Sequence, residues 1–280
     1  MAENRSEKNN SITKRALGVI VCTGIVFVFY LQMILTKAIT ETLFVDTSNL
    51  AAMTFKEALY AISSLVMGTM LGKSPFKMLS LPSSLHKRKW CKRIVFMMTV
   101  CYLPMMLIMN VVLQDLDNPT LTFRPLDEII CFITLMFLIG IAEETLFRGI
   151  IAESMKHIWG KNNRDVASFI SGLFFGLIHL VNLSSADTVG VLCQVCSATA
   201  AGMMFADLYY ATGSLWPCII FHSMVDFCAL MGLGLFGIGS VGGIISSYTP
   251  IMCLLSVILI IIRIILMINR KSRKVFCNFS

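Results

Sequence analysis

The chain has 280 residues, of which 56% are hydrophobic and 14% charged, whereas about a quarter of a typical soluble protein is charged. This composition excludes a soluble globular protein and predicts an all-α, polytopic membrane helix bundle. The formal net charge of +7 does not indicate nucleic-acid binding, because the basic residues form no stripe interleaved with aromatic side chains.

Eight apolar runs predict about eight transmembrane helices, each of which needs about 20 residues to cross a bilayer. The second run is short and is expected to extend back toward Leu50, which leaves Lys56 and Glu57 near the membrane interface. Pro104 is expected to kink the third helix, and Pro217 suits the first turn of the seventh. The runs cover residues 16–36, 58–72, 94–113, 129–151, 166–183, 188–206, 216–232 and 244–268.

Lysine and arginine gather in alternate connections between these runs, with seven of them in residues 73–93. By the positive-inside rule, both termini are therefore predicted to be cytoplasmic. This divides the chain into a cytoplasmic tail (1–15), a membrane-embedded domain (16–268) and a basic cytoplasmic tail (269–280) that suits anionic lipid headgroups. Arg263, near the end of the eighth run, is expected to snorkel to the membrane surface.

Most of the 10 cysteines lie inside apolar runs, where they are expected to act as small apolar fillers and not as a disulfide framework. The Cys193-x-x-Cys196 pair lacks the strand-helix context of a redox motif. The C-terminal residues from Cys277 resemble a prenylation box, but Asn278 is not aliphatic, so a plain tail is predicted.

Ionisable side chains concentrate in three of the apolar runs. Each charged group at a bilayer centre costs about 2.5–3.5 kcal/mol on insertion scales, so such groups need a structural or chemical reason. Any one set alone fits a tie between helices, but together they predict one shared cavity. The residues are Glu143, Glu144 and Arg148 in the fourth run, His179 in the fifth, and His222 and Asp226 in the seventh.

Helical spacing divides these groups by direction. Residues four apart share a helix face, so Glu144 is expected to pair with Arg148, and His222 to lie beside Asp226. Glu143 lies about 100° around the helix from its neighbour and is expected to face the histidines.

A carboxylate, two imidazoles and an aspartate suit the attack of water on a carbonyl group, with one group as base and others as oxyanion donors. Spacing recommends neither a serine–histidine pair nor a nucleophilic cysteine, so water is the expected nucleophile. Glu143, His179, His222 and Asp226 are equally a plausible Zn²⁺ ligand set. The sequence does not separate these two interpretations.

The three motifs, in this order, resemble the CAAX prenyl protease and bacteriocin-processing (CPBP) family of intramembrane proteases, described either as metalloproteases or as glutamate-dependent. The resemblance covers residues 129–230 and implies a protease core there. Its motifs are Glu143-Glu144-x-x-x-Arg148, Phe175-x-x-x-His179 and His222-x-x-x-Asp226.

The resemblance also implies roles. Glu143 with His179 would activate water, and His222 with Asp226 would form the oxyanion side. Asp226 stands where some members have Asn, and an ionised Asp is a poor oxyanion donor, so it is expected to be protonated or to orient His222. Support of the local geometry would come from Glu144, Arg148 and Phe175.

Measured from the cytoplasmic ends of the predicted runs, Glu143 and His222 lie roughly 12 Å deep and His179 roughly 20 Å deep. This mismatch predicts an elbow before the fifth helix, near Arg164, and a cavity open to the cytoplasm.

The leading hypothesis is an intramembrane endopeptidase acting on a membrane-associated or lipid-modified peptide or protein, in a bacterial plasma membrane. The alternative is a non-catalytic bacteriocin-immunity or scaffold protein of the same fold. A third hypothesis, a proton-coupled transporter, lacks support from inverted repeats or broken helices. The expected partners are the peptide substrate and membrane lipids, with no nucleic acid.

Overall fold

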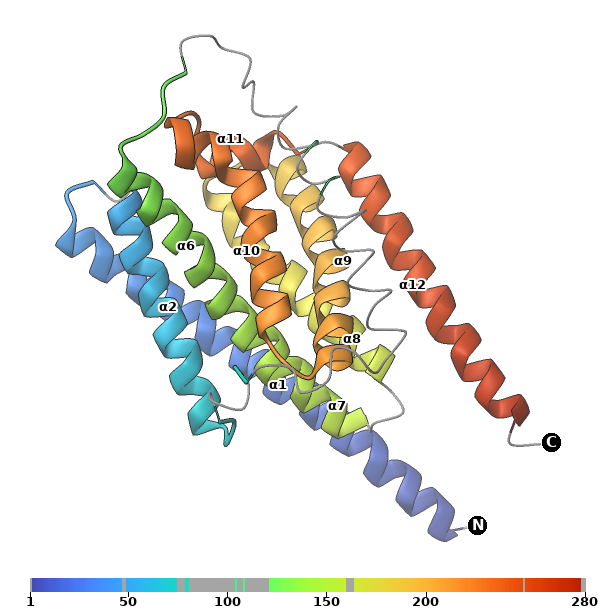
Figure 1. Cartoon of the computed structure of the whole chain (residues 1–280). Helices are drawn as coiled ribbons and strands as arrows, with labels where there is room; N and C mark the ends of the chain where they lie inside the picture. Colours follow the sequence, from blue (N-terminus) through green and yellow to red (C-terminus); the bar gives the residue numbers. More distant parts are fainter. Residues whose placement is uncertain are drawn as a thin grey trace.

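The structure is a bundle of long helices (Figure 1). The computed structural model describes residues 2–46, 49–74, 79–80, 104, 108, 121–159, 164–248 and 250–277, and the regular elements in these ranges are all helical. Six helices there are long and apolar enough to cross a membrane, and residues Pro250–Ile265 form a shorter apolar helix. The prediction of an all-α, polytopic membrane protein is confirmed. The predicted third span lies outside the described residues except for Pro104 and Ile108, and so do residues 278–280.

Three non-α segments extend the regular helices. A π-helical segment, Thr145–Ala152, joins α6 to α7, so that residues 126–159 form one continuous span. A 3-10 segment, His179–Ser184, extends α8, and a second π-helical segment, Gly232–Phe236, extends α10. The helices are α1 (Ala2–Leu43), α2 (Leu50–Met70), α6 (Leu126–Glu144), α7 (Glu153–Trp159), α8 (Arg164–Ile178), α9 (Thr188–Thr212), α10 (Trp216–Met231), α11 (Val241–Ser246) and α12 (Pro250–Cys277).

Local sequence signals explain where these helices begin and end. The side chains of Asn49 and Asp187 accept hydrogen bonds from main-chain N–H groups in the first turns of α2 and α9. Helix α9 ends at Gly213, whose φ of +73° is readily available to glycine. Pro217 lies in the first turn of α10, as predicted. The short turn between α9 and α10 makes these helices antiparallel neighbours.

The π-helical segment is bonded to two neighbouring helices through its own main chain. Such a segment uses i to i+5 hydrogen bonds and often occurs at functional sites. The carbonyl of Phe147 accepts a hydrogen bond from the hydroxyl of Ser171 on α8 (2.8 Å). The carbonyl of Ala152 accepts one from the hydroxyl of Tyr210 on α9 (2.7 Å). These bonds fix the C-terminal half of the span against α8 and α9.

Glycines allow the site-bearing helices to approach closely. A Cβ atom on Gly140 of α6 would lie 2.7 Å from the Ser223 hydroxyl and 3.0 Å from the Ile219 carbonyl of α10. A Cβ on Gly202 of α9 would lie 2.8 Å from the Cα of Gly172 on α8. Small residues at helix crossings are a common device of membrane bundles, and here they bring α6 against α10 and α8 against α9.

Two sequence predictions about helix ends were wrong. Helix α2 does begin at Leu50, but Lys56 and Glu57 lie well inside it, with side chains only 31% and 14% exposed. The last helix begins at Pro250 and not at Ile244, which is buried in α11. The glycines and serines around α11 interrupt the apolar pattern, so the run had been drawn too long.

The prediction that Arg263 snorkels to the membrane surface was also wrong. Its side chain is 15% exposed and donates two hydrogen bonds to Asp207 of α9 (2.7 and 2.8 Å) and one to Asp165 of α8 (2.7 Å). Two carboxylates on neighbouring helices satisfy the guanidinium inside the bundle. This cluster ties α12 to α8 and α9.

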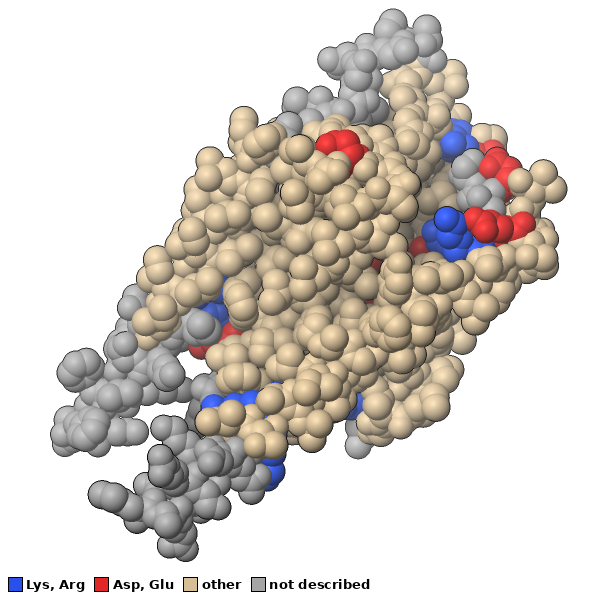
Figure 2. All heavy atoms as spheres, turned by 180° about the vertical axis from the view of Figure 1, so that it is seen from behind, with Lys and Arg blue, Asp and Glu red and all other residues tan. Residues whose placement is uncertain are grey.

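Polarity is distributed as expected for a membrane bundle. Large apolar side chains of α1 and α12 are exposed, among them Ile20 (66%) and Ile251 (65%), whereas Glu144 and Arg148 are fully buried. Figure 2 shows a face that is largely uncharged, with charged groups mainly toward the two ends of the helices. Figure 1 shows both chain ends at the same end of the bundle. That this end is cytoplasmic stays a prediction.

Candidate active site

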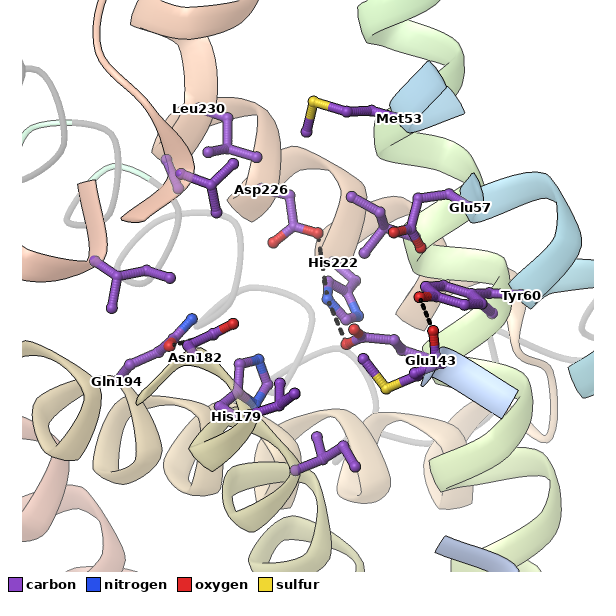
Figure 3. A pocket seen from close by; sticks show the side chains of 18 of the residues that line it. Met53, Glu57, Tyr60, Glu143, His179, Asn182, Gln194, His222, Asp226 and Leu230 are labelled. Atoms are coloured by element: carbon purple, nitrogen blue, oxygen red, sulfur yellow. Dashed lines mark hydrogen bonds and ion pairs between the residues drawn. The ribbon is translucent and has the colours of Figure 1, made fainter. Parts of the chain in front are cut away.

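The side chains predicted to share a cavity do line one. A cavity of about 270 Å³ is lined by Glu143, His179, His222 and Asp226, together with residues of α1, α2, α9 and α11 (Figure 3). Figure 2 shows a hollow in which acidic atoms are recessed. Three distant parts of the sequence therefore meet at one half-enclosed polar space.

The two adjacent glutamates at the end of α6 have different environments. The side chain of Glu143 is 24% exposed and faces the cavity. Glu144 is fully buried and accepts a hydrogen bond from Nη1 of Arg148 (2.8 Å). The predicted pairing of Glu144 with Arg148 is confirmed.

Arg148 is held mainly by aromatic rings. Its guanidinium carbon lies 4.4 Å from the ring centre of Phe175 and 5.2 Å from that of Phe205. Its Nε and Nη2 atoms are buried and make no hydrogen bond to the residues that the structure describes. Ring faces attract a guanidinium electrostatically, most strongly where water is excluded. The charge is thus balanced by one carboxylate and two rings.

His222 is the meeting point of three carboxylates. Its Nδ1 lies 2.7 Å from Oε1 of Glu144, and its Nε2 lies 3.4 Å from Oδ2 of Asp226 and 3.6 Å from Oε2 of Glu143. The ring stacks on Phe205 at 5.5 Å between centres and 16° between planes. Because Glu144 binds both Arg148 and Nδ1 of His222, it fixes the orientation of the imidazole. The sequence placed Glu144 among the site residues but did not predict this contact.

His179 is the first residue of the 3-10 segment that follows α8. Its Nδ1 lies 2.8 Å from the main-chain carbonyl of Phe175. A carbonyl oxygen can only accept, so Nδ1 carries the proton and a neutral His179 keeps the lone pair on Nε2. The Phe175 ring meets both imidazoles edge-on, at 5.2 Å and 82° for His179 and 5.5 Å and 87° for His222. Phe175 therefore spaces the two histidines.

Several cavity residues were missed from the sequence. Glu57 of α2 lines the cavity beside its ion-pair partner Lys56 (3.6 Å). Asn182 and Gln194 also line it and are bonded to each other. An acidic residue in a continuous apolar helix was a usable signal for Glu57, but Glu57 was expected at the membrane interface. Single amides give no comparable signal.

Tyr248, between α11 and α12, lines the same cavity. Burial, with a smaller contribution from the charge of Asp226, raises the pKa of its phenol to about 12. The phenol is therefore neutral near physiological pH and remains a hydrogen-bond donor.

The histidines and carboxylates do not fit the suggested zinc set as they lie. Structural and catalytic zinc sites hold nitrogen and oxygen ligands at about 2.0–2.2 Å. In the part of the chain that the structure describes, no group of three or more His, Cys, Asp and Glu side chains is arranged to hold a metal ion. Phe175 packs edge-on against both imidazole rings.

The predicted elbow before α8 is not needed. The fourth span continues to Trp159, which is 16 residues beyond Glu143, and His179 is 15 residues beyond Arg164 at the start of α8. Glu143 and His179 thus lie at similar depth, measured from the end of the bundle at which Trp159 and Arg164 lie.

The cavity extends toward the opposite end of the bundle from the two chain ends. Its lining includes Val241 and Ile244 of α11, which Figure 1 shows at the end far from both termini. That the cavity opens to the cytoplasm stays a prediction.

Residues 125–228 match the family model described as Rce1-like, type II CAAX prenyl endopeptidase Rce1-like. The matched segment runs from the start of α6 into α10 and leaves α1, α2 and α12 outside it. No curated protein sequence matches the chain.

The match confirms the resemblance to the CPBP proteases that the three motifs predicted. This central segment matches the model of the Rce1-like family, which is a protease family. With its apolar helices, the chain is a multi-pass integral membrane protein.

Proposed function

We propose that the protein is an intramembrane endopeptidase in which Glu143 activates a water molecule for attack on a peptide carbonyl. The observation that carries the proposal is the meeting of Glu143, His179 and His222 on one cavity inside an apolar bundle. Ionisable side chains within membrane helices usually mark a functional site.

The first step needs a base and an oriented water. The Glu143 carboxylate faces the cavity and takes the proton of the water. Nε2 of His179, whose ring is fixed through Nδ1, accepts the second hydrogen of the water and aims its oxygen. General base catalysis of this kind contributes about 10²–10⁴-fold in rate.

The second step needs a donor for the oxyanion and a proton for the leaving group. Nε2 of His222, when protonated, donates to the oxyanion, and Glu144 holds the ring in position through Nδ1. Asp226, 3.4 Å from Nε2, orients this nitrogen and balances its charge. As the C–N bond breaks, Glu143 returns the proton to the leaving amine.

The substrate class follows from the membrane setting and the family. A bond cut in this cavity belongs to a membrane-associated peptide, such as a prenylated C-terminus or a bacteriocin or signalling-peptide precursor in a bacterial plasma membrane. The exposed apolar helices give a lipid chain on the substrate a place in the surrounding bilayer. The open, water-accessible carboxylate of Glu143 disfavours the immunity or scaffold alternative, which has no use for it.

The decisive experiment replaces Glu143 by glutamine, which keeps its shape and removes its basicity. The purified protein in proteoliposomes is given a peptide that ends in farnesyl-cysteine and three further residues, together with an unprenylated twin. Released fragments are measured by mass spectrometry.

The Glu143→Gln variant should lose activity about 10²–10⁴-fold. The matched control is Glu41→Gln, because Glu41 is an exposed residue of α1 paired only with Lys37. Full cleavage by the Glu143→Gln variant would show that Glu143 is not the general base. If the unmodified protein cleaves neither peptide, the proposed activity on these peptides is contradicted.

A further inference from the structure

Two amide side chains form a pair on the cavity wall. Asn182 belongs to the 3-10 segment and Gln194 to the second turn of α9, and both are half-buried and line the cavity. Nδ2 of Asn182 donates to Oε1 of Gln194 at 2.8 Å. Figure 3 shows the pair on the same side of the cavity as His179.

The pair always has one donor group and one acceptor left over. As drawn, the NH₂ group of Gln194 and the oxygen of Asn182 make no other hydrogen bond within the described residues. If both amides are turned over, the leftover groups exchange places, but one NH₂ and one carbonyl still remain. An adjacent donor and acceptor are the complement of the N–H and C=O groups of one residue in an extended chain, which point to the same side of the strand.

The corner that bears Asn182 is rigid. The Asn182 carbonyl accepts hydrogen bonds from the N–H groups of Ser185 (3.0 Å) and Ala186 (2.9 Å). Asp187 then caps α9, and its own N–H donates to the hydroxyl of Ser246 on α11 (3.0 Å). A binding group held in this way loses little entropy when a ligand arrives.

The pair also lies beside the reacting groups. Asn182 is three residues after His179 in the same 3-10 segment, and side chains at this spacing eclipse one another. A substrate residue held by Asn182 and Gln194 would thus neighbour the water that His179 is proposed to aim.

We propose that Asn182 and Gln194 form a subsite that holds the main-chain N–H and C=O groups of one residue of an extended substrate next to the bond to be cut. This proposal rests on the proposed endopeptidase function and names the feature of the substrate that is recognised. A prenyl chain has no group to bond to the pair. A carboxylate would place an oxygen against the amide carbonyl, so the pair selects an amide.

The test uses Asn182→Ala, Gln194→Ala and the double variant, on the farnesylated peptide and on ester analogues in which one backbone N–H is replaced by oxygen. The matched control is Gln32→Ala, which removes an amide that pairs with Ser63 between α1 and α2, away from the cavity. Thermal stability, KM and kcat are measured, and binding is measured separately in the Glu143→Gln background.

Each single variant should raise KM about 2- to 10-fold, the value of one net hydrogen bond, with a smaller change in kcat. Replacing the N–H at one substrate position by the ester oxygen should raise the KM of the unmodified protein by a similar factor. The same ester should not change the KM of the double variant, because the side chain that bonds to this N–H is already gone. The Gln32→Ala variant should keep the KM and the ester sensitivity of the unmodified protein.

The outcomes separate the subsite from the hydrolase. Equal ester sensitivity in the double variant, or a KM change no greater than that of Gln32→Ala, overturns the subsite and leaves the endopeptidase intact. Peptide that is bound in an amide-dependent way but never cleaved supports the subsite and overturns the endopeptidase. Absence of any peptide binding overturns both.

Discussion

The bundle buries two arginine–carboxylate clusters whose hydrogen bonding differs. Arg263 donates three hydrogen bonds to two aspartates, and both carboxylates are committed to it. Arg148 donates one to Glu144, and its Nε and Nη2 atoms have no partner among the described residues. The Arg263 cluster is closed and ties three helices. The Arg148 cluster is under-satisfied: Arg148 and Nδ1 of His222 both bond to Oε1 of Glu144, while Oε2 has no partner among the described residues. This difference separates a structural ion cluster from one that serves a site.

Breaking the Arg148 cluster should have the largest effect. Arg148→Met leaves Glu144 buried and uncompensated, so we expect a loss of about 3–5 kcal/mol in the free energy of unfolding and loss of peptide cleavage. Thermal unfolding in detergent and the mass-spectrometric assay measure the two effects.

The double variant Arg148→Met with Glu144→Leu sharpens this prediction. It removes both charges and should recover most of the stability, since apolar replacements of a buried pair are often neutral. It should not recover cleavage, because His222 has lost its acceptor at Nδ1. Recovered cleavage would show that Glu144 has no orienting role.

Breaking the Arg263 cluster should separate stability from activity. Arg263→Met leaves Asp207 and Asp165 without their shared partner and should cost about 3 kcal/mol of unfolding free energy. The kcat of the folded fraction should be unchanged, since Arg263 does not line the cavity. A fall in kcat with stability preserved would contradict the assignment of this cluster as purely structural.

Adding a methyl group at Gly140 should disturb the site without changing any ionisable side chain. The new Cβ would press on Ile219 and Ser223 of α10, and overpacking of this kind costs about 1–3 kcal/mol. Separation of α6 from α10 should lengthen the contact between Glu144 and His222 and lower kcat. Gly24→Ala is the control, because nothing lies within 4 Å of its added Cβ. An equal loss of kcat in that variant would contradict the explanation by separation of α6 from α10.

The smallest effect is expected for Phe205→Leu. The change removes the ring stacked on His222 and one of the faces beneath Arg148. Such aromatic contacts are worth about 0.5–1.5 kcal/mol beyond their burial, so kcat should fall less than in the Arg148 variant. Phe123→Leu, which removes a ring packed only on Phe236, should leave kcat unchanged.

Local spacing accounts for the parts of the site that the sequence predicted. The pairing of Glu144 with Arg148 and the nearness of His222 to Asp226 follow from one helical turn. The contact between Glu144 and His222 joins residues 78 apart in sequence, and it depends on the close approach of α6 and α10. No pattern within one helix specifies that approach.

The same limit explains the errors about charged residues. Glu57 and Arg263 were assigned to the membrane surface because each lay near the end of a drawn apolar run. Their actual environment is set by other helices, namely the cavity for Glu57 and two aspartates for Arg263. The helical, membrane-spanning type of the fold followed from composition, but the partners across helices did not.

The π-helical segment has an evolutionary consequence. Its links to α8 and α9 use the carbonyls of residues 147 and 152 as acceptors. Every amino acid carries a carbonyl, so point mutations at these two positions cannot delete the acceptors. In related sequences, residues 147 and 152 should therefore vary more, as far as packing allows, than Ser171 and Tyr210. The two attachments depend on the hydroxyl groups of Ser171 and Tyr210.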